Sequence, residues 1–117
     1  LHQTVSGTFS NSASTNGKCT YFIEHSKVEE MLFISIYPYG RSLKESFYED
    51  TFQDVKIKKP SGKVVTIEAF CFDGMIYFSE EEYVQLMDAI KERGEYKVSM
   101  KYKTESTQSR YRFKFNN

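Results

Sequence analysis

Residues 95–103 read Glu-Tyr-Lys-Val-Ser-Met-Lys-Tyr-Lys, and residues 110–115 read Arg-Tyr-Arg-Phe-Lys-Phe. In both stretches polar and apolar side chains alternate, which is the pattern of a β-strand with one face in the core and the other in water. The polar segment 104–109 joins the two stretches, so we expect an antiparallel hairpin. This hairpin indicates a protein built mainly from β-sheet.

Five stretches upstream of the hairpin also have the composition or the alternation of strands. They are residues 18–24, 31–37, 55–58, 65–71 and 75–78. The second of these is apolar at nearly every position, which predicts a central strand covered on both faces. The last three are joined by short turns and are expected to form an antiparallel meander. Residues 41–54 fit either a short helix or a long loop.

One helix is predicted after the meander, over residues of about 80–93. Ser79 and Glu82 have the spacing of a capping box, in which each side chain binds a backbone amide at the start of the helix. Gly94 is expected to end it. An apolar stripe follows the helical period at Tyr83, Leu86, Met87 and Ile90. Together these elements predict an α+β, β-rich fold, an antiparallel sheet or sandwich of about six to seven strands with one amphipathic helix.

Length and composition describe one small domain. The chain has 117 residues, of which 27% are charged and 39% hydrophobic, and this balance is typical of folded proteins rather than disordered ones. No apolar run reaches the length of a membrane-spanning helix. We expect residues 17–117 to form a single globular domain. Residues 1–16 are expected to form a flexible polar lead that could include a first strand, and their removal is expected to leave the fold intact.

The start of the chain and its cysteines suggest a location. The chain begins with Leu1 rather than Met, and its lead has the Ser, Thr and Asn content of exported linkers. We therefore expect an extracellular, periplasmic or cell-envelope protein, with a lipoprotein as one form and a cytoplasmic protein as the alternative. Cys19 and Cys71 both fall on predicted core faces, so they could form a disulfide in an oxidising compartment. Two buried free thiols are the other interpretation.

Charge is balanced over the whole chain but uneven along it. The 16 basic and 16 acidic side chains cancel, yet segment 24–54 is acidic, and Lys56, Lys58, Lys59 and Lys63 make the meander basic. The outer face of the terminal hairpin is the most basic part, with Lys97, Lys101, Lys103, Arg110, Arg112 and Lys114. Such a face could bind an anionic macromolecule, an anionic surface or an acidic partner protein. Alternatively, these cations only keep the strands soluble and prevent edge-to-edge pairing.

Nucleic acid is the least favoured of these partners. The aromatic side chains of the hairpin alternate to the face opposite the cations, whereas proteins that bind single strands need stacking rings beside their charges. A second candidate binding feature is residues 37–41, where Tyr37, Tyr39 and Arg41 flank a rigid turn and could anchor an interface. An ordinary loop is the alternative there.

The sequence predicts no catalytic or metal site and no cofactor. Its only histidines are His2 and His25, and no cluster of His, Cys and carboxylates has the spacing of metal ligands. We therefore expect a non-catalytic binding domain of an exported or envelope protein. The alternative is an intracellular accessory, inhibitor or immunity-type protein that presents acidic segment 45–54 to a basic partner. A cysteine-dependent enzyme is a remote third hypothesis, kept because the thiols have no assigned role.

Overall fold

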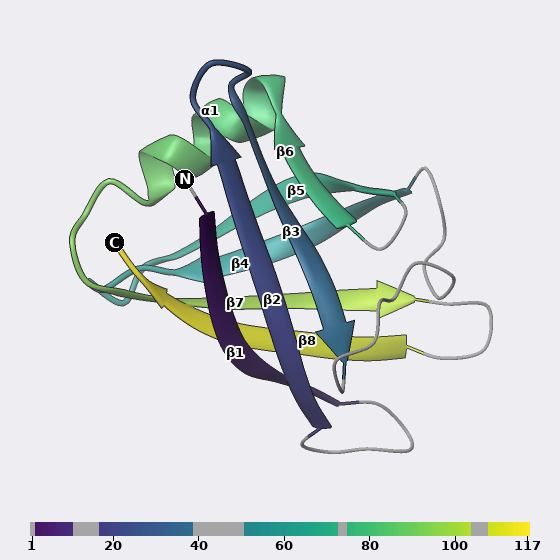
Figure 1. Cartoon of the computed structure of the whole chain (residues 1–117). Coiled ribbons are helices and arrows are strands. Elements are labelled where there is room, and N and C mark those ends of the chain that lie inside the picture. The colour runs from purple at the N-terminus through teal and green to yellow at the C-terminus, as the bar shows by residue number, and fades with distance from the viewer. Residues whose placement is uncertain (1, 11–16, 39–50, 73–74, 104–107) are drawn as a thin grey trace.

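A computed structural model of the chain describes residues 2–10, 17–38, 51–72, 75–103 and 108–117. It contains eight strands and one helix among these residues (Figure 1). In chain order they are β1 (His2–Ser10), β2 (Gly17–Ser26), β3 (Met31–Pro38), β4 (Thr51–Lys58), β5 (Val64–Phe72), β6 (Met75–Ser79), α1 (Glu80–Ala89), β7 (Glu95–Lys103) and β8 (Gln108–Asn116).

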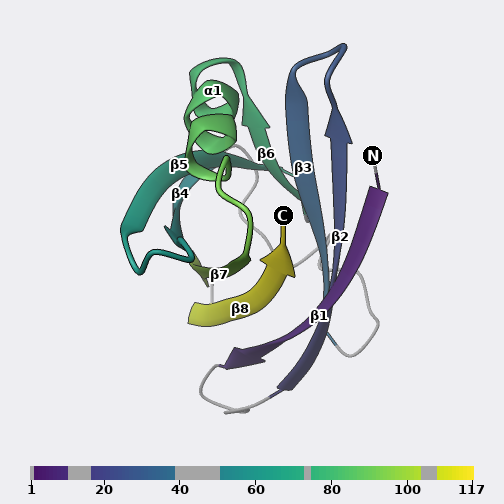
Figure 2. The same ribbon diagram turned by 90° about the vertical axis from the view of Figure 1, so that its left-hand side faces the viewer.

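The strands close into a barrel in the order β1-β2-β3-β6-β5-β4-β7-β8, and β8 pairs with β1 to complete the ring. Every neighbouring pair is antiparallel. Figure 2 shows the strands curving around a common interior, with α1 against one end. The expected β-rich antiparallel fold with one short helix is confirmed. The open sheet or sandwich of fewer strands is wrong, because β1 adds a strand that pairs on both of its sides and closes the sheet.

Most strand predictions agree with the structure. The terminal hairpin is β7–β8, and the meander is β4–β5–β6. Residues 51–54 belong to β4 rather than to a helix or a loop, whereas residues 41–50 lie outside the described residues. The alternating apolar side chains point inward as expected, so that Tyr21, Tyr96 and Phe78 are fully buried in the core.

The two fully buried tyrosines, Tyr21 and Tyr96, each have a hydrogen-bond acceptor for the hydroxyl group, as a buried donor requires. The Tyr21 hydroxyl donates to the Thr8 carbonyl at 2.9 Å, and the Tyr96 hydroxyl donates to the Glu92 carbonyl at 2.6 Å. Burial raises the pKa of Tyr21 above its usual range. The Tyr21 ring also lies 4.4 Å from the Phe113 ring, centroid to centroid. The core is therefore aromatic as well as aliphatic.

Helix α1 starts where the sequence predicted, but its N-terminal cap and its C-terminal end differ from the prediction. Ser79 is the N-cap and has an extended backbone, yet its side chain makes no capping hydrogen bond, so the predicted capping box is wrong in that respect. The helix also ends at Ala89, earlier than expected. Gly94 does not end the helix but immediately precedes β7, where its backbone has φ +137°. There it exchanges two backbone hydrogen bonds with Asn117, the residue that follows β8.

Helix α1 covers one end of the barrel. It packs on β3, β5 and β6, and it buries Tyr83, Leu86 and Ala89 against them. The one helix among the described residues is too short and too polar to cross a membrane.

The two cysteines are buried free thiols. Cys19 lies on β2 and Cys71 on β5, and β3 and β6 stand between these strands in the barrel order. A disulfide between them is therefore not supported, and the structure agrees with the alternative of two separate thiols in the core.

Candidate functional site

The predicted basic residues gather on the outer face of β4, β7 and β8, which are neighbours in the barrel. Lys58 pairs directly with Lys97, and Lys97 pairs directly with Lys114, so three cations stand side by side across three strands. In the next row Lys56 pairs with Ser99, and Ser99 pairs with Arg112. Because adjacent strands are about 4.8 Å apart, the three lysines fall within about 10 Å of one another at the backbone.

These residues line an open hollow of about 520 Å³ on the barrel exterior. We call it the basic hollow. Its charged side chains are all exposed and all positive, and hydroxyl groups stand between them; no carboxylate lines it among the described residues. The cations are Lys56, Lys58, Lys97, Arg112 and Lys114, and the hydroxyl groups are those of Ser6, Thr8 and Ser99.

The basic hollow has the electrostatics of an anion site. Like charges placed directly opposite each other on neighbouring strands destabilise a sheet. Among the residues that the structure describes, the only ion pair is Lys91 with Asp88, which lies elsewhere, so none of the cations of the hollow is ion-paired with a described carboxylate. Glu95 is the carboxylate nearby, in a neighbouring hollow that Lys58 and Lys97 also line. An anion bound across Lys58, Lys97 and Lys114 would remove that repulsion.

The remaining predicted site residues are divided between three places. Lys101 and Arg110 pair directly and line a smaller hollow of about 300 Å³ beside Asp54, so their charge is partly balanced. The Lys103 side chain, Tyr39 and Arg41 lie outside the described residues. Tyr37 is on β3, which stands across the barrel from β7, so the structure does not bring it to the basic face.

Lys56 and Lys58 belong to the hollow although the sequence did not single them out as binding residues. The signal was their alternation with Val55 and Ile57, which places them outward. Their approach to the terminal hairpin depends on the β4–β7 pairing.

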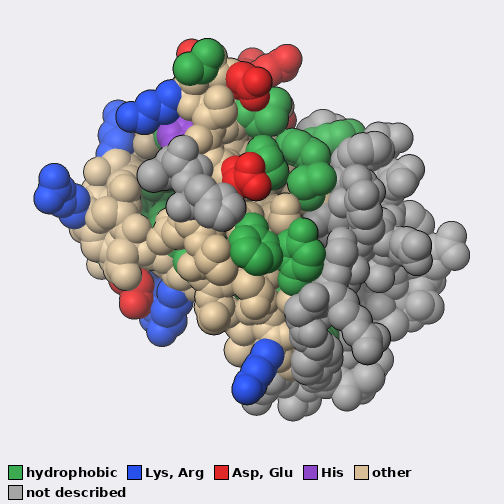
Figure 3. Space-filling view, in the orientation of Figure 1, with side chains coloured by type: hydrophobic (Ala, Val, Ile, Leu, Met, Phe, Trp, Pro, Cys, Tyr) green, Lys and Arg blue, Asp and Glu red, His purple; other side chains and the backbone are tan. Residues whose placement is uncertain are grey.

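The outer face around Tyr37 has a different character. Figure 3 shows hydrophobic side chains gathered over β2, β3 and β6. Phe22 and Tyr37 meet edge to face with ring centroids 5.0 Å apart, and Phe33 and Tyr77 lie 5.6 Å apart. The inner side chains of β3 are buried but its outer side chains are only half-buried, so the expectation of a strand covered on both faces holds in part.

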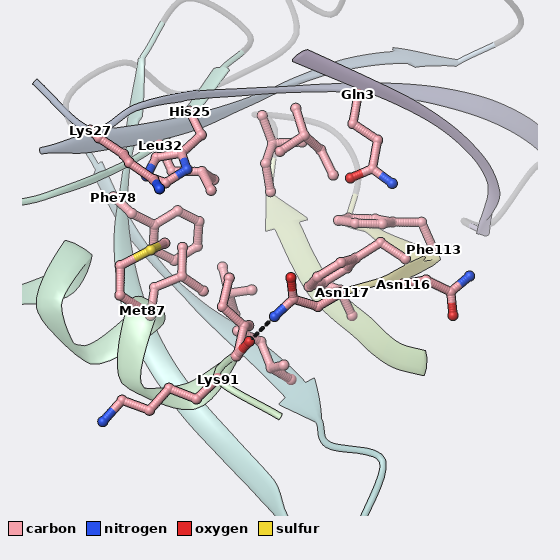
Figure 4. A pocket seen from close by; sticks show the side chains of 18 residues that line it. Gln3, His25, Lys27, Leu32, Phe78, Met87, Lys91, Phe113, Asn116 and Asn117 are labelled. Atoms are coloured by element: carbon pink, nitrogen blue, oxygen red, sulfur yellow. Dashed lines mark hydrogen bonds between the residues drawn. The ribbon is translucent and has the colours of Figure 1, made fainter. Parts of the chain in front are cut away.

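A second candidate site lies inside the barrel, at the end covered by α1. Its volume is about 410 Å³, and we call it the end cavity (Figure 4). Its lining comes from seven of the eight strands, from α1 and from the residues that follow the helix, and most of it is apolar. These apolar residues are Ile23, Leu32, Ile34, Val55, Ile57, Phe78, Leu86, Met87, Ile90, Val98, Phe113 and Phe115. The polar lining residues are Gln3, His25, Lys27, Lys91, Asn116 and Asn117.

Two hydrogen bonds tie the elements around the end cavity. His25 Nε2 lies 2.6 Å from the Tyr83 hydroxyl, which joins β2 to α1. The Asn117 side-chain amide donates to the Ile90 carbonyl and joins the end of β8 to the residue after the helix. Burial, together with the nearby Lys27 ammonium, lowers the pKa of His25.

Comparison of the chain with protein-family models, with curated proteins and with solved structures finds no match.

Neither thiol has the surroundings of a catalytic nucleophile. Cys19 and Cys71 are both buried, and burial raises the pKa of Cys19, whereas a reactive cysteine needs exposure and a lowered pKa. His25 is the histidine whose side chain the structure describes, and it lies against Tyr83. Within the described ranges, no group of three or more His, Cys, Asp or Glu side chains converges as metal ligands would.

Proposed function

We propose that this protein is a non-catalytic binding domain that holds an acidic segment of another protein in the basic hollow. The observation that carries the proposal is the unbroken row Lys58–Lys97–Lys114, with no carboxylate in the lining around it. Repulsion between these like charges lowers the stability of the free protein. An acidic partner would relieve that repulsion, and the relief would contribute to the free energy of binding.

The surroundings of the cations favour a carboxylate-bearing protein over a nucleic acid. Single-stranded nucleic acids are held by aromatic side chains as well as by charge. The described aromatic residues of β7 and β8, namely Tyr96, Tyr111, Phe113 and Phe115, point into the barrel instead. What stands beside the cations are the hydroxyl groups of Thr8 and Ser99, which can donate hydrogen bonds to carboxylate oxygens.

The proposal is tested by fluorescence anisotropy with a labelled peptide of alternating Asp and Glu. We expect binding at about 50 mM NaCl that weakens strongly at about 300 mM, because salt screens exposed charges. The double variant Lys97→Glu with Lys114→Glu should weaken binding by about tenfold or more.

The matched control is Lys63→Glu with Arg93→Glu, which changes the net charge by the same amount outside the hollow. It should bind within about twofold of wild type. If both double variants weaken peptide binding equally, the effect comes from net charge alone, and the basic hollow is not the binding site. A single-stranded DNA oligonucleotide that binds more tightly than the peptide would overturn the class of partner.

Other parts of the functional hypothesis stay predictions. Export to the envelope, the periplasm or the medium is one of them, and so is the intracellular inhibitor alternative. Most of the acidic segment 45–54 on which that alternative depends lies outside the described residues.

A further inference from the structure

We propose that the end cavity binds a small amphipathic monocarboxylate, with its aliphatic chain inside the barrel and its carboxylate at the mouth beside Lys27. This ligand is distinct from the acidic partner of the basic hollow, and the two sites share only Val98 and Phe113 in their linings.

The body of the cavity fits an apolar group. A volume of about 410 Å³ falls in the range of about 300–1,000 Å³ that is usual for small-molecule sites. Eight-stranded barrels either fill their interior with side chains or hold one small ligand. Here Phe9, Tyr21 and Tyr111 belong to the packed core and do not line the cavity, which lies at the end of the barrel that α1 covers. The mostly apolar lining favours an aliphatic chain over a polar solute.

The polar groups at the mouth favour a carboxylate head. Gln3, His25 and Lys27 come from β1, β2 and the turn after β2, and they lie along one side of the cavity in Figure 4. Among the described residues no Asp or Glu lines the cavity, so nothing there would repel an anion.

Lys27 is the cation available to that head. The other lining lysine, Lys91, is ion-paired with Asp88 at 2.8 Å, and Figure 4 shows its side chain directed away from the cavity. Lys27 stands beside His25, whose lowered pKa reflects that proximity among other causes. A carboxylate at this position would meet the Lys27 ammonium as a charged hydrogen-bond donor.

The test is titration of the whole chain with decanoate, decanol and decylammonium by isothermal calorimetry, with two-dimensional amide NMR to locate the site. We expect decanoate to bind more tightly than decylammonium by about tenfold. Amide shifts should fall on α1 and on the start of β1. If none of the three amphiphiles binds, or if decylammonium binds as well as decanoate, the proposal is overturned.

The helix offers a matched pair of variants for the cavity. Met87→Trp places a large ring into the cavity, whereas Val84→Trp places it on the exposed face of α1, where Val84 is 63% exposed. Decanoate affinity should fall by about tenfold or more in the first variant and stay within about twofold in the second. Thermal melting checks that both variants fold. Ile23→Phe fills the cavity from the opposite wall if Met87→Trp does not fold. Unchanged binding in a folded cavity-filling variant would overturn the site.

Substitutions of Lys27 and Lys91 test which lysine binds the carboxylate head group. Lys27→Gln should lower the affinity for decanoate by about threefold to tenfold and leave the affinity for decanol unchanged, because one exposed charge contributes modestly to binding. Lys91→Gln should leave both unchanged. The Lys97→Glu, Lys114→Glu double variant should bind decanoate as wild type does. A loss there would place the ligand in the basic hollow and contradict the end cavity, whatever the outcome of the peptide experiment.

Discussion

At Gly7 the backbone of β1 passes so close to β8 that no side chain fits between them. A Cβ atom there would collide with the Arg112 carbonyl oxygen and would lie 2.8 Å both from the Phe113 Cβ and from the Tyr21 ring. In an ordinary strand, replacing glycine by alanine lowers the entropy of the unfolded chain and helps stability. At this position the steric cost outweighs that gain.

We therefore expect Gly7→Ala to lower the free energy of unfolding by about 1–3 kcal/mol, the usual cost of forcing an extra group into a packed core. Urea unfolding followed by circular dichroism measures the change. Ser6→Ala is the control, since Ser6 is the exposed neighbour on the same strand, and it should change stability by less than about 0.5 kcal/mol. A Gly7→Ala protein as stable as wild type would show that β1 and β8 are further apart than described.

At the scale of the elements, the contact between His25 and Tyr83 attaches α1 to the barrel. The two rings are 5.5 Å apart, with the nitrogen and the hydroxyl in hydrogen-bond contact. Burial and Lys27 lower the pKa of His25 in the folded protein. The unfolded chain therefore binds this proton more readily, and the contribution of neutral His25 to stability is complete above its unfolded pKa of about 6.5. It declines as the pH falls through the lower, folded pKa.

We expect the melting temperature of wild type to fall between about pH 7 and about pH 5 by more than that of His25→Gln, which cannot titrate. The comparison is made by thermal melts over that range in matched buffers. Tyr83→Phe keeps the ring but removes the hydroxyl, so it should lower stability at neutral pH through the lost hydrogen bond. Identical pH profiles for wild type and His25→Gln would show that protonation of His25 is not coupled to folding.

The same helix shows what local sequence can and cannot predict. Ser79 does precede its first turn, and the three glutamates of that turn suit the positive end of the helix dipole. The capping hydrogen bond was not formed, and the helix stopped at Ala89 because the chain must turn there to start β7 beside β4. The local sequence therefore predicted where the helix begins, whereas packing against the neighbouring strands set its length and the geometry of its cap.

At the scale of the whole molecule, β1 converts an open sheet into a closed barrel. It pairs with β2 over residues 2–9 and with β8 over residues 7–10. Without β1, both β2 and β8 would become exposed edges, and exposed edges promote aggregation. This role contrasts with the sequence-based expectation that the lead can be removed.

Deletion of residues 1–10 is expected to remove cooperative unfolding or to lower the melting temperature by about 10 °C or more, because it uncovers two edges and part of the core. Thermal melting and gel filtration measure stability and association. A synthetic peptide of residues 1–10 is the control, and its addition should restore part of the lost stability. A truncated protein that melts like wild type and stays monomeric would contradict the structural role of β1.

What the sequence determined by itself was the orientation of side chains within each element. Alternation along residues 95–103 placed Tyr96, Val98 and Met100 in the core and Lys97 and Lys101 outside, because a strand turns successive side chains to opposite faces. The same rule predicted which residues of the terminal hairpin are candidates for anion binding. It could not predict that Lys58 stands beside Lys97, since alternation is the same for every pair of strands.

Only the tertiary structure decided which strands are neighbours. The β3–β6, β4–β7 and β1–β8 pairings join segments far apart in the chain, and they depend on closing the whole ring at once. Those pairings bring the cations of two hairpins into one row and create the basic hollow. They also leave the end cavity beneath α1. Both candidate sites are therefore properties of the closed barrel, because strand register and curvature are set by all eight strands together.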